Sequence, residues 1–162
     1  MFKFFGKKKQ IDNQVYAPAT GELVDISQVS DKVFSSKAMG EGFGIQPNAD
    51  QIVAPVSGTV SMVASTKHAI GITMANGLEV LIHMGVDTVD LKGAPFEIQV
   101  AADEPVTGGQ PIATMDLAQV KAANLDTVII VVITNSADKL GALNVAKGPV
   151  EQSQVVGTVT TK

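Results

Sequence analysis

Most of the chain alternates between short apolar stretches and turn-forming residues. From Val15 onward, segments rich in Val, Ile and Thr are separated by Gly, Pro, Asn and Asp, a pattern typical of β-strands joined by turns. Many short strands at close spacing predict an all-β fold, a sandwich or a barrel. The segments expected to form strands are residues 21–26, 51–53, 58–63, 69–74, 78–83, 96–100, 110–115, 127–134 and 155–160.

One segment has no polar side at all. Residues 128–133 are Val or Ile throughout, which predicts a central strand buried on both faces. Helical signals are few. Asp116 is an N-cap candidate with Gln119 three residues later as a capping-box partner, so a helix is expected to start there. A second short helical turn is expected at residues 136–140.

Part of the sequence occurs twice. Residues 16–24 resemble residues 53–61, since both read apolar, Ala-Pro, small residue, hydroxyl residue, Gly, and then a strand. The matched Gly21 and Gly58 predict a shared turn that needs an unusual backbone angle. We infer a duplicated β unit.

Composition narrows the class of protein. The chain has 162 residues, 45% of them apolar and 17% charged, which indicates one globular domain. No apolar run approaches the roughly 20 residues that a membrane span needs, and the N-terminus does not resemble a secretory signal. Cysteine is absent, which excludes disulfides and thiol chemistry. A cytoplasmic protein is therefore expected.

The charge of the chain narrows the class of protein further. The net charge is -4 and every basic residue is Lys. An acidic chain without Arg is a poor nucleic-acid binder, so no nucleic-acid partner is expected. Without Arg, the chain also cannot form a bidentate guanidinium clamp on a phosphoryl group.

The N-terminal residues 1–13 differ from the rest, which we assign to one domain of residues 14–162. Three of the six Phe lie among Lys residues here. The segment is either a frayed tail, or an amphipathic segment that makes weak contact with a membrane surface.

The candidate functional residues are the only two histidines, His68 and His83, which flank a predicted hairpin turn at Asn76-Gly77. A two-residue loop would pair His83 with Ile70 and place His68 diagonally on the same face, roughly 7–8 Å away. The two imidazoles could have no joint function, support phosphoryl transfer, bind a metal, or act as acid and base.

The neighbours of the histidines carry further information. The Met-Gly-Val-Asp sequence after His83 would expose the ring and offer backbone groups near it. A carbonyl that accepts from Nδ1 would leave Nε2 as a nucleophile. Thr66 places a hydroxyl two residues before His68, where it could orient that ring.

These residues resemble a known family. Residues 80–93 read Val-Leu-Ile-His-Met-Gly-Val-Asp-Thr-Val-x-Leu-x-Gly and, with Thr66-x-His68-Ala69, are similar to the enzyme IIA signature of glucose/sucrose-type sugar phosphotransferase systems. The resemblance runs from about residue 15 to about residue 160. Further matches lie at residues 39–42, 54–60, 107–108 and 134–135.

The resemblance implies an antiparallel β-sandwich with a duplicated hybrid motif and one or two short helices. It also implies that Nε2 of His83 takes a phosphoryl group from HPr, the small phosphocarrier protein, and passes it to a cysteine of enzyme IIB and so to sugar. His68 would hydrogen-bond the phosphoryl group, with Thr66 as its supporting hydroxyl. The carbonyl of Gly85 would hold the His83 ring, and Asp87 would lie where partner cations dock.

This chemistry requires no cofactor, although His68 and His83 are candidates for a zinc ion shared with a partner. We also expect a partner Arg to enter the transition state, and some relatives bind regulatory targets when unphosphorylated. A ring of apolar side chains, which we call the collar, would exclude water around the histidines. Ordinary packing in the core would account for its candidate residues equally well. The candidates are Val33, Phe34, Ala38, Met39, Ile70, Leu81 and Met84.

Two alternatives belong to other classes. His83-x-x-x-Asp87 resembles the first ligand pair of zinc peptidases, but the His-x-His that supplies their third ligand is absent. Residues 106–112 resemble a turn of biotinyl or lipoyl carrier domains. The nearest candidate for the modified residue, Lys37, follows Ser36 where those domains have Met.

Overall fold

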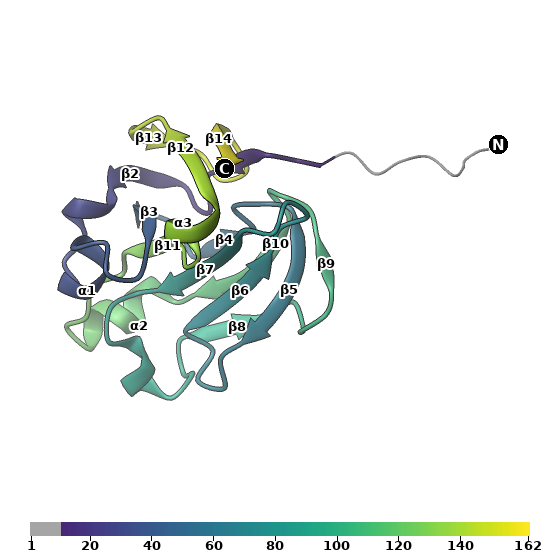
Figure 1. The fold of residues 1–162 in the computed structure, drawn as a ribbon. Helices are drawn as coiled ribbons and strands as arrows, with labels where there is room; N and C mark the ends of the chain where they lie inside the picture. Colours follow the sequence, from purple (N-terminus) through teal and green to yellow (C-terminus); the bar gives the residue numbers. More distant parts are fainter. Residues whose placement is uncertain (1–10) are drawn as a thin grey trace.

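The computed structural model describes residues 11–162, so the tail predicted for residues 1–13 lies mostly outside the described residues. Short strands dominate, as predicted (Figure 1). No helix among residues 11–162 has the length and apolar character of a membrane span. The strands are β1 (Gln14–Tyr16), β2 (Gly21–Asp25), β3 (Glu41–Pro47), β4 (Gln51–Val53), β5 (Gly58–Val63), β6 (Ala69–Thr73), β7 (Glu79–Met84), β8 (Phe96–Ile98), β9 (Pro105–Val106), β10 (Pro111–Met115), β11 (Ile129–Ile133), β12 (Leu140–Val145), β13 (Gly148–Val150) and β14 (Val155–Thr161). The short helices are η1 (Ile26–Gln28), α1 (Lys32–Ser35), η2 (Thr88–Leu91), α2 (Leu117–Ala122) and α3 (Ser136–Lys139).

The strands form three sheets whose order has an internal symmetry. The eight-stranded sheet runs β13-β2-β3-β11-β7-β6-β5-β9, and the two smaller sheets run β1-β14-β12 and β4-β10-β8. A two-fold axis between β11 and β7 exchanges the two halves of the large sheet and the two small sheets. All pairings are antiparallel. The antiparallel all-β class is confirmed.

Hydrogen bonds at the repeated sequence follow the same symmetry. Tyr16 N–H donates to the carbonyl of Pro55, and Val53 N–H donates to that of Pro18, each at 2.8 Å. Because residues 16 and 53 correspond, as do 18 and 55, the two bonds are equivalents that cross the axis. The duplicated unit inferred from nine residues therefore extends over the fold.

The two matched glycines are needed for a different reason from the one predicted. Neither Gly21 nor Gly58 has a positive φ, so the expected unusual turn angle is wrong. A Cβ on Gly21 would lie 2.0 Å from the carbonyl oxygen of Gln46, and one on Gly58 would lie 2.3 Å from that of Thr73. Each glycine is required because the neighbouring strand approaches closely.

The central strand β11 is buried on both faces, as predicted. Ile129, Val131 and Ile133 point into the main core, between the large sheet and the small sheets. Ile130 and Val132 point to the opposite face, where a second cluster forms beneath η1 and α1. A strand that serves two apolar layers needs apolar residues at every position.

Several elements were not anticipated. The predicted strands all occur within about two residues of their expected ends, and Asp116 caps α2 by accepting from Gln119 N–H at 3.1 Å. The expected turn at residues 136–140 is α3. The elements that were not predicted are β1, β3, β9, β12, β13, η1, α1 and η2.

The hairpin between β6 and β7 has a longer loop than predicted. Met74 N–H donates to the carbonyl of Leu78 at 2.9 Å, so the loop has three residues, 75–77, and ends at Gly77 with φ +93°. His83 consequently lies opposite Ala69 and not Ile70. The predicted register is wrong by one residue because a third residue joins the loop.

The backbone conformation of Gly77 predicts how substitutions there change the stability of the protein. Gly77→Ala should lower the free energy of unfolding by about 1 kcal/mol, because the added Cβ is strained at this positive φ. Urea denaturation measures the loss. Gly77→Asn is the matched control and should cost less, since Asn tolerates left-handed backbone better than Ala. Equal stability of the Ala variant and the parent would contradict the turn geometry.

Candidate active site at two facing histidines

His83 lies on the outer face of the large sheet. In β7 the side chains of Val80, Ile82 and Met84 point into the main core, and alternation sends His83 to the other side. There it lies between its register partners, Ala69 of β6 and Ile130 of β11. The ring is half-buried, on a strand that is paired on both sides near the centre of the sheet.

A turn directly after β7 orients the His83 ring. Nδ1 of His83 lies 2.8 Å from the carbonyl oxygen of Gly85. A carbonyl can only accept, so Nδ1 carries the proton and Nε2 has the free lone pair when the ring is neutral. Gly85 has φ +80°, and a Cβ there would lie 2.4 Å from the methyl carbon of Thr88. Only glycine fits at this position.

His68 reaches the same place by a different route. It precedes β6, at the end of a turn in which Lys67 has φ +64°, so strand alternation does not set its direction. Its carbonyl accepts from Met84 N–H at 2.8 Å, and its Nδ1 lies 2.6 Å from the hydroxyl of Thr66. The two imidazole centroids are 5.2 Å apart, with the planes at 76°. The predicted proximity thus occurs, although the predicted register does not.

Helix α1 covers the other side of His83. The carboxylate of Asp31 caps α1 by accepting from Val33 N–H at 2.8 Å and Phe34 N–H at 3.3 Å. The ring of Phe34 then lies against that of His83, with centroids 5.0 Å apart. Asp31 was missed from the sequence, although an Asp before a Lys-Val-Phe run is an N-cap signal that could have identified it.

Burial keeps both histidines neutral. It is the largest cause lowering the pKa of His83, and the positive form of His68 lowers it further. The bond to Gly85 and the carboxylates of Asp31 and Asp87 oppose this by favouring the charged ring. Burial also lowers the pKa of His68. Near pH 7 both rings therefore have an unprotonated nitrogen.

The apolar surroundings differ in part from the predicted collar. Ile70 and Met84 have no exposed surface and belong to the main core, so their place in the collar is wrong. Leu81 lies half-buried on the His83 face and packs against the second apolar cluster, as does Val86, which the sequence analysis missed. Ala38 and two larger apolar residues, Val33 and Met39, are exposed, the latter two at 54% and 37%.

The remaining predicted site residue, Asp87, is exposed beyond the end of β7 and begins η2 with a left-handed φ of +61°. No group of three His, Cys, Asp or Glu side chains that could hold a metal occurs among residues 11–162. His68 and His83 alone supply two imidazoles, which fall short of the three protein ligands of a catalytic zinc. Zinc shared with a partner stays a prediction.

A half-buried neutral imidazole with one oriented nitrogen and a second imidazole beside it is an arrangement that can support nucleophilic or acid–base chemistry. Residues 13–139 match the family described as phosphoenolpyruvate-dependent sugar phosphotransferase system, EIIA 1. The chain belongs to this family, and phosphoryl transfer in sugar uptake is its class of activity.

Individual relatives agree with this. A protein named PTS system glucose-specific EIIA component, from Staphylococcus aureus, is 43% identical over 145 residues, which cover 88% of this chain and 87% of that protein. A PTS system glucose-specific EIICBA component from Streptococcus pneumoniae is 47% identical over 127 residues, which cover 78% of this chain and 18% of that protein. The structure of glucose permease IIA from Mycoplasma capricolum aligns with a TM-score of 0.80 and 35% identity, covering 96% of this chain and 98% of that one.

The site makes a prediction about protonation. Phe34→Ala should raise the pKa of His83 toward its ordinary value, because removing the ring lets water reach the imidazole. Since the folded-state pKa is lowered, neutral His83 contributes stability above its unfolded pKa that is lost as the pH falls through the folded pKa. The pH range between the unfolded and folded pKa of His83, over which this stability is lost, should therefore be narrower in Phe34→Ala.

An NMR pH titration of the imidazole protons measures the effect, with His68→Gln used to assign the two rings. Val33→Ala is the control, since this neighbouring side chain is 54% exposed. An unchanged His83 pKa in Phe34→Ala would show that Phe34 does not shield the ring.

Proposed function

We propose that this chain carries a phosphoryl group on Nε2 of His83, accepting it from phospho-HPr and donating it to a cysteine of an enzyme IIB during glucose uptake. The observation that carries the proposal is the bond from Nδ1 of His83 to the Gly85 carbonyl, which leaves Nε2 as the free nitrogen. The names of the relatives support glucose as the sugar. The EIICBA relative supports an enzyme IIB partner, because it joins a matching segment to further parts of the system.

The transfer is a displacement at phosphorus. The lone pair on Nε2 of neutral His83 attacks the phosphoryl group as the phosphorus–nitrogen bond to the HPr histidine breaks. In the second step a cysteine thiolate of enzyme IIB attacks, and the bond to Nε2 breaks. The lowered pKa of His83 keeps the lone pair available near neutral pH.

His68 supplies a hydrogen bond to the transferring group. If the Thr66 hydroxyl donates to Nδ1 at 2.6 Å, the proton of neutral His68 lies on Nε2, where it can donate to a phosphoryl oxygen. His68 then stabilises negative charge in the transition state without carrying a charge itself. Thr66 acts as a positioning residue through this ring.

The charges around the site point to cationic partners. Asp31 and Asp87 lie near enough to affect the His83 pKa, and the chain has no Arg of its own. We expect a partner Arg to complete the site, because a guanidinium matches both the rim carboxylates and the phosphoryl oxygens. The exposed Val33 and Met39 would pack against the partner and exclude water. The cytoplasmic location, and regulatory binding in the unphosphorylated state, stay predictions.

Phosphorylation of His83 is directly testable. Incubation with phosphoenolpyruvate, enzyme I and HPr should place acid-labile phosphate on His83, because it has the oriented nucleophilic nitrogen. Phosphopeptide mapping identifies the site, and His83→Ala should lose all label. His83→Gln is a control for packing. Label retained by His83→Ala would place the phosphoryl group elsewhere.

His68→Gln separates acceptance from donation. The variant should still accept label from HPr, since Nε2 of His83 is intact, but should donate to enzyme IIB roughly 100-fold more slowly, the size of a lost transition-state hydrogen bond. Rapid-quench measurement of the two half-reactions tests this. Normal donation by the variant would make His68 a bystander.

A further inference from the structure

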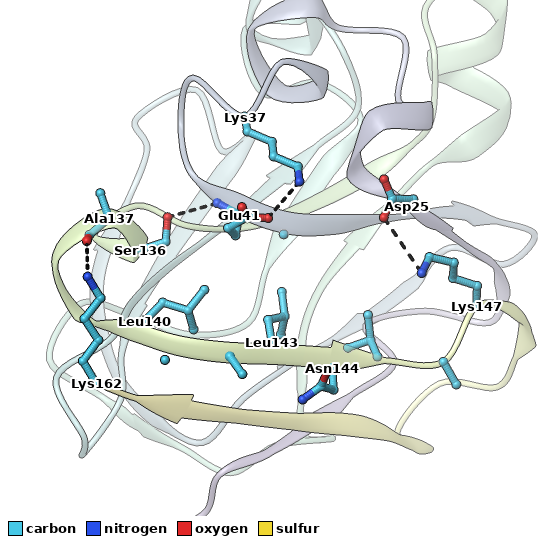
Figure 2. Close-up of a pocket in the computed structure, with 15 residues that line it drawn as sticks. Asp25, Lys37, Glu41, Ser136, Ala137, Leu140, Leu143, Asn144, Lys147 and Lys162 are labelled. Carbon is cyan, nitrogen blue, oxygen red and sulfur yellow. Dashed lines mark hydrogen bonds and ion pairs between the residues drawn. The ribbon is translucent and has the colours of Figure 1, made fainter.

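A groove lies on a different part of the surface from the histidines, beside the free edge of β12. Figure 2 shows β12 along one wall and the start of β3, with Glu41, along the other. Its volume is about 880 Å³, and none of its lining residues belongs to the histidine site. At one end Lys147 approaches Asp25, and at the other Lys162 donates to the Ala137 carbonyl.

The β12 edge presents unpaired backbone groups to this groove. Within residues 11–162, β12 pairs only with β14. Ala146 N–H donates to the Val156 carbonyl at 2.9 Å, so the even-numbered residues face β14. By alternation, the N–H and C=O groups of Leu143 and Val145 point the other way. On the facing wall β2 ends at Asp25, opposite Phe43, so the first two residues of β3 lack a strand on that side.

Nothing in the sequence of β12 blocks pairing at this edge. Residues 140–146 contain no Pro and no charged residue, which are the usual protections of an edge strand. The symmetry-related edge strand, β8, has only three residues, whereas β12 has six and spans roughly 20 Å. The pairing of β12 has one register shift, between Leu140 and Ala142, so the regular part of the edge is residues 142–145. A regular edge without Pro or charge beside a groove matches the sites where an extended peptide adds as a further strand.

The charged side chains that line the groove indicate which kind of peptide would bind there. The groove is lined by three Lys, and the two carboxylates there are already within 4 Å of Lys37 and Lys147. Lys162 has only a carbonyl contact, so one cation remains without a carboxylate in the described part of the chain. Residues 1–10 carry four Lys and no acidic residue, so like charge disfavours them as the occupant. A second copy fits poorly, because each β12 edge faces a wall of its own molecule.

We propose that the groove binds an extended acidic segment of a partner protein as a fourth strand beside β12. The segment would hydrogen-bond to the outward groups of Leu143 and Val145 and place a carboxylate near Lys162. This surface is separate from the histidines, so a partner could occupy it while His83 is phosphorylated. The proposal does not depend on the function of the histidines.

The test titrates ¹⁵N-labelled protein with an acetylated, amidated six-residue peptide of alternating glutamate and valine. Amide shifts should change at Leu143 and Val145, and those amides should become protected from hydrogen exchange. Two control peptides should bind more weakly. One has lysine in place of glutamate, and the other has N-methyl groups on alternate backbone nitrogens, which removes strand pairing.

Lys162→Glu should weaken binding of the glutamate peptide roughly fivefold, the size expected for reversing one surface charge, and high salt should reduce the difference. Lys121→Glu on α2, outside the groove, is the matched control and should change nothing. The proposal fails if millimolar glutamate peptide leaves the β12 amides unshifted, or if the lysine or N-methylated peptide binds equally well. It also fails if sedimentation shows a dimer and the amides of Leu143 and Val145 are already protected from exchange without peptide.

Discussion

The site depends on one constraint, the hydrogen bond that joins Nδ1 of His83 to the carbonyl of Gly85. The bond needs the chain to turn back immediately after β7, and the turn needs Gly85 because a Cβ would collide with Thr88. Gly85 is held in turn by its own N–H, which donates to the Val128 carbonyl at 2.8 Å just before β11. The His83 ring is thus oriented by backbone groups next to β7 and β11, and backbone groups do not change rotamer.

The duplicated architecture places these two strands at the centre of the large sheet. β7 and β11 meet at the two-fold axis, where the halves of the eight-stranded sheet join. Each is paired on both sides, and β11 has apolar residues packed on both faces. The two halves differ at the histidine site. Only one half carries histidines, and η1 and α1 cover the outer face on one side of them.

Two surfaces of the molecule offer different kinds of recognition. The histidine face combines exposed apolar side chains with the carboxylates of Asp31 and Asp87, which suits a folded partner with cationic side chains. The groove beside β12 offers backbone hydrogen bonds and an unmatched Lys162, which suits an extended acidic segment. Because the two sets of residues do not overlap, phosphoryl transfer and the proposed binding in the groove need not compete.

The sequence by itself determined the fold class, the buried strand β11 and the repeat, because alternation, apolar runs and turn residues can be read directly along the chain. The contact of the Gly85 carbonyl with the His83 ring was expected only from the resemblance to a known family. Only the tertiary structure decided the hairpin register, the route of His68 to its place, and the positions of Asp31 and Phe34 on His83. These depend on contacts between segments far apart in sequence, and one added loop residue changes every pairing beyond it. The tertiary structure also decided the burial of Ile70 and Met84, because only the packing of the sheets determines which apolar residues face the core.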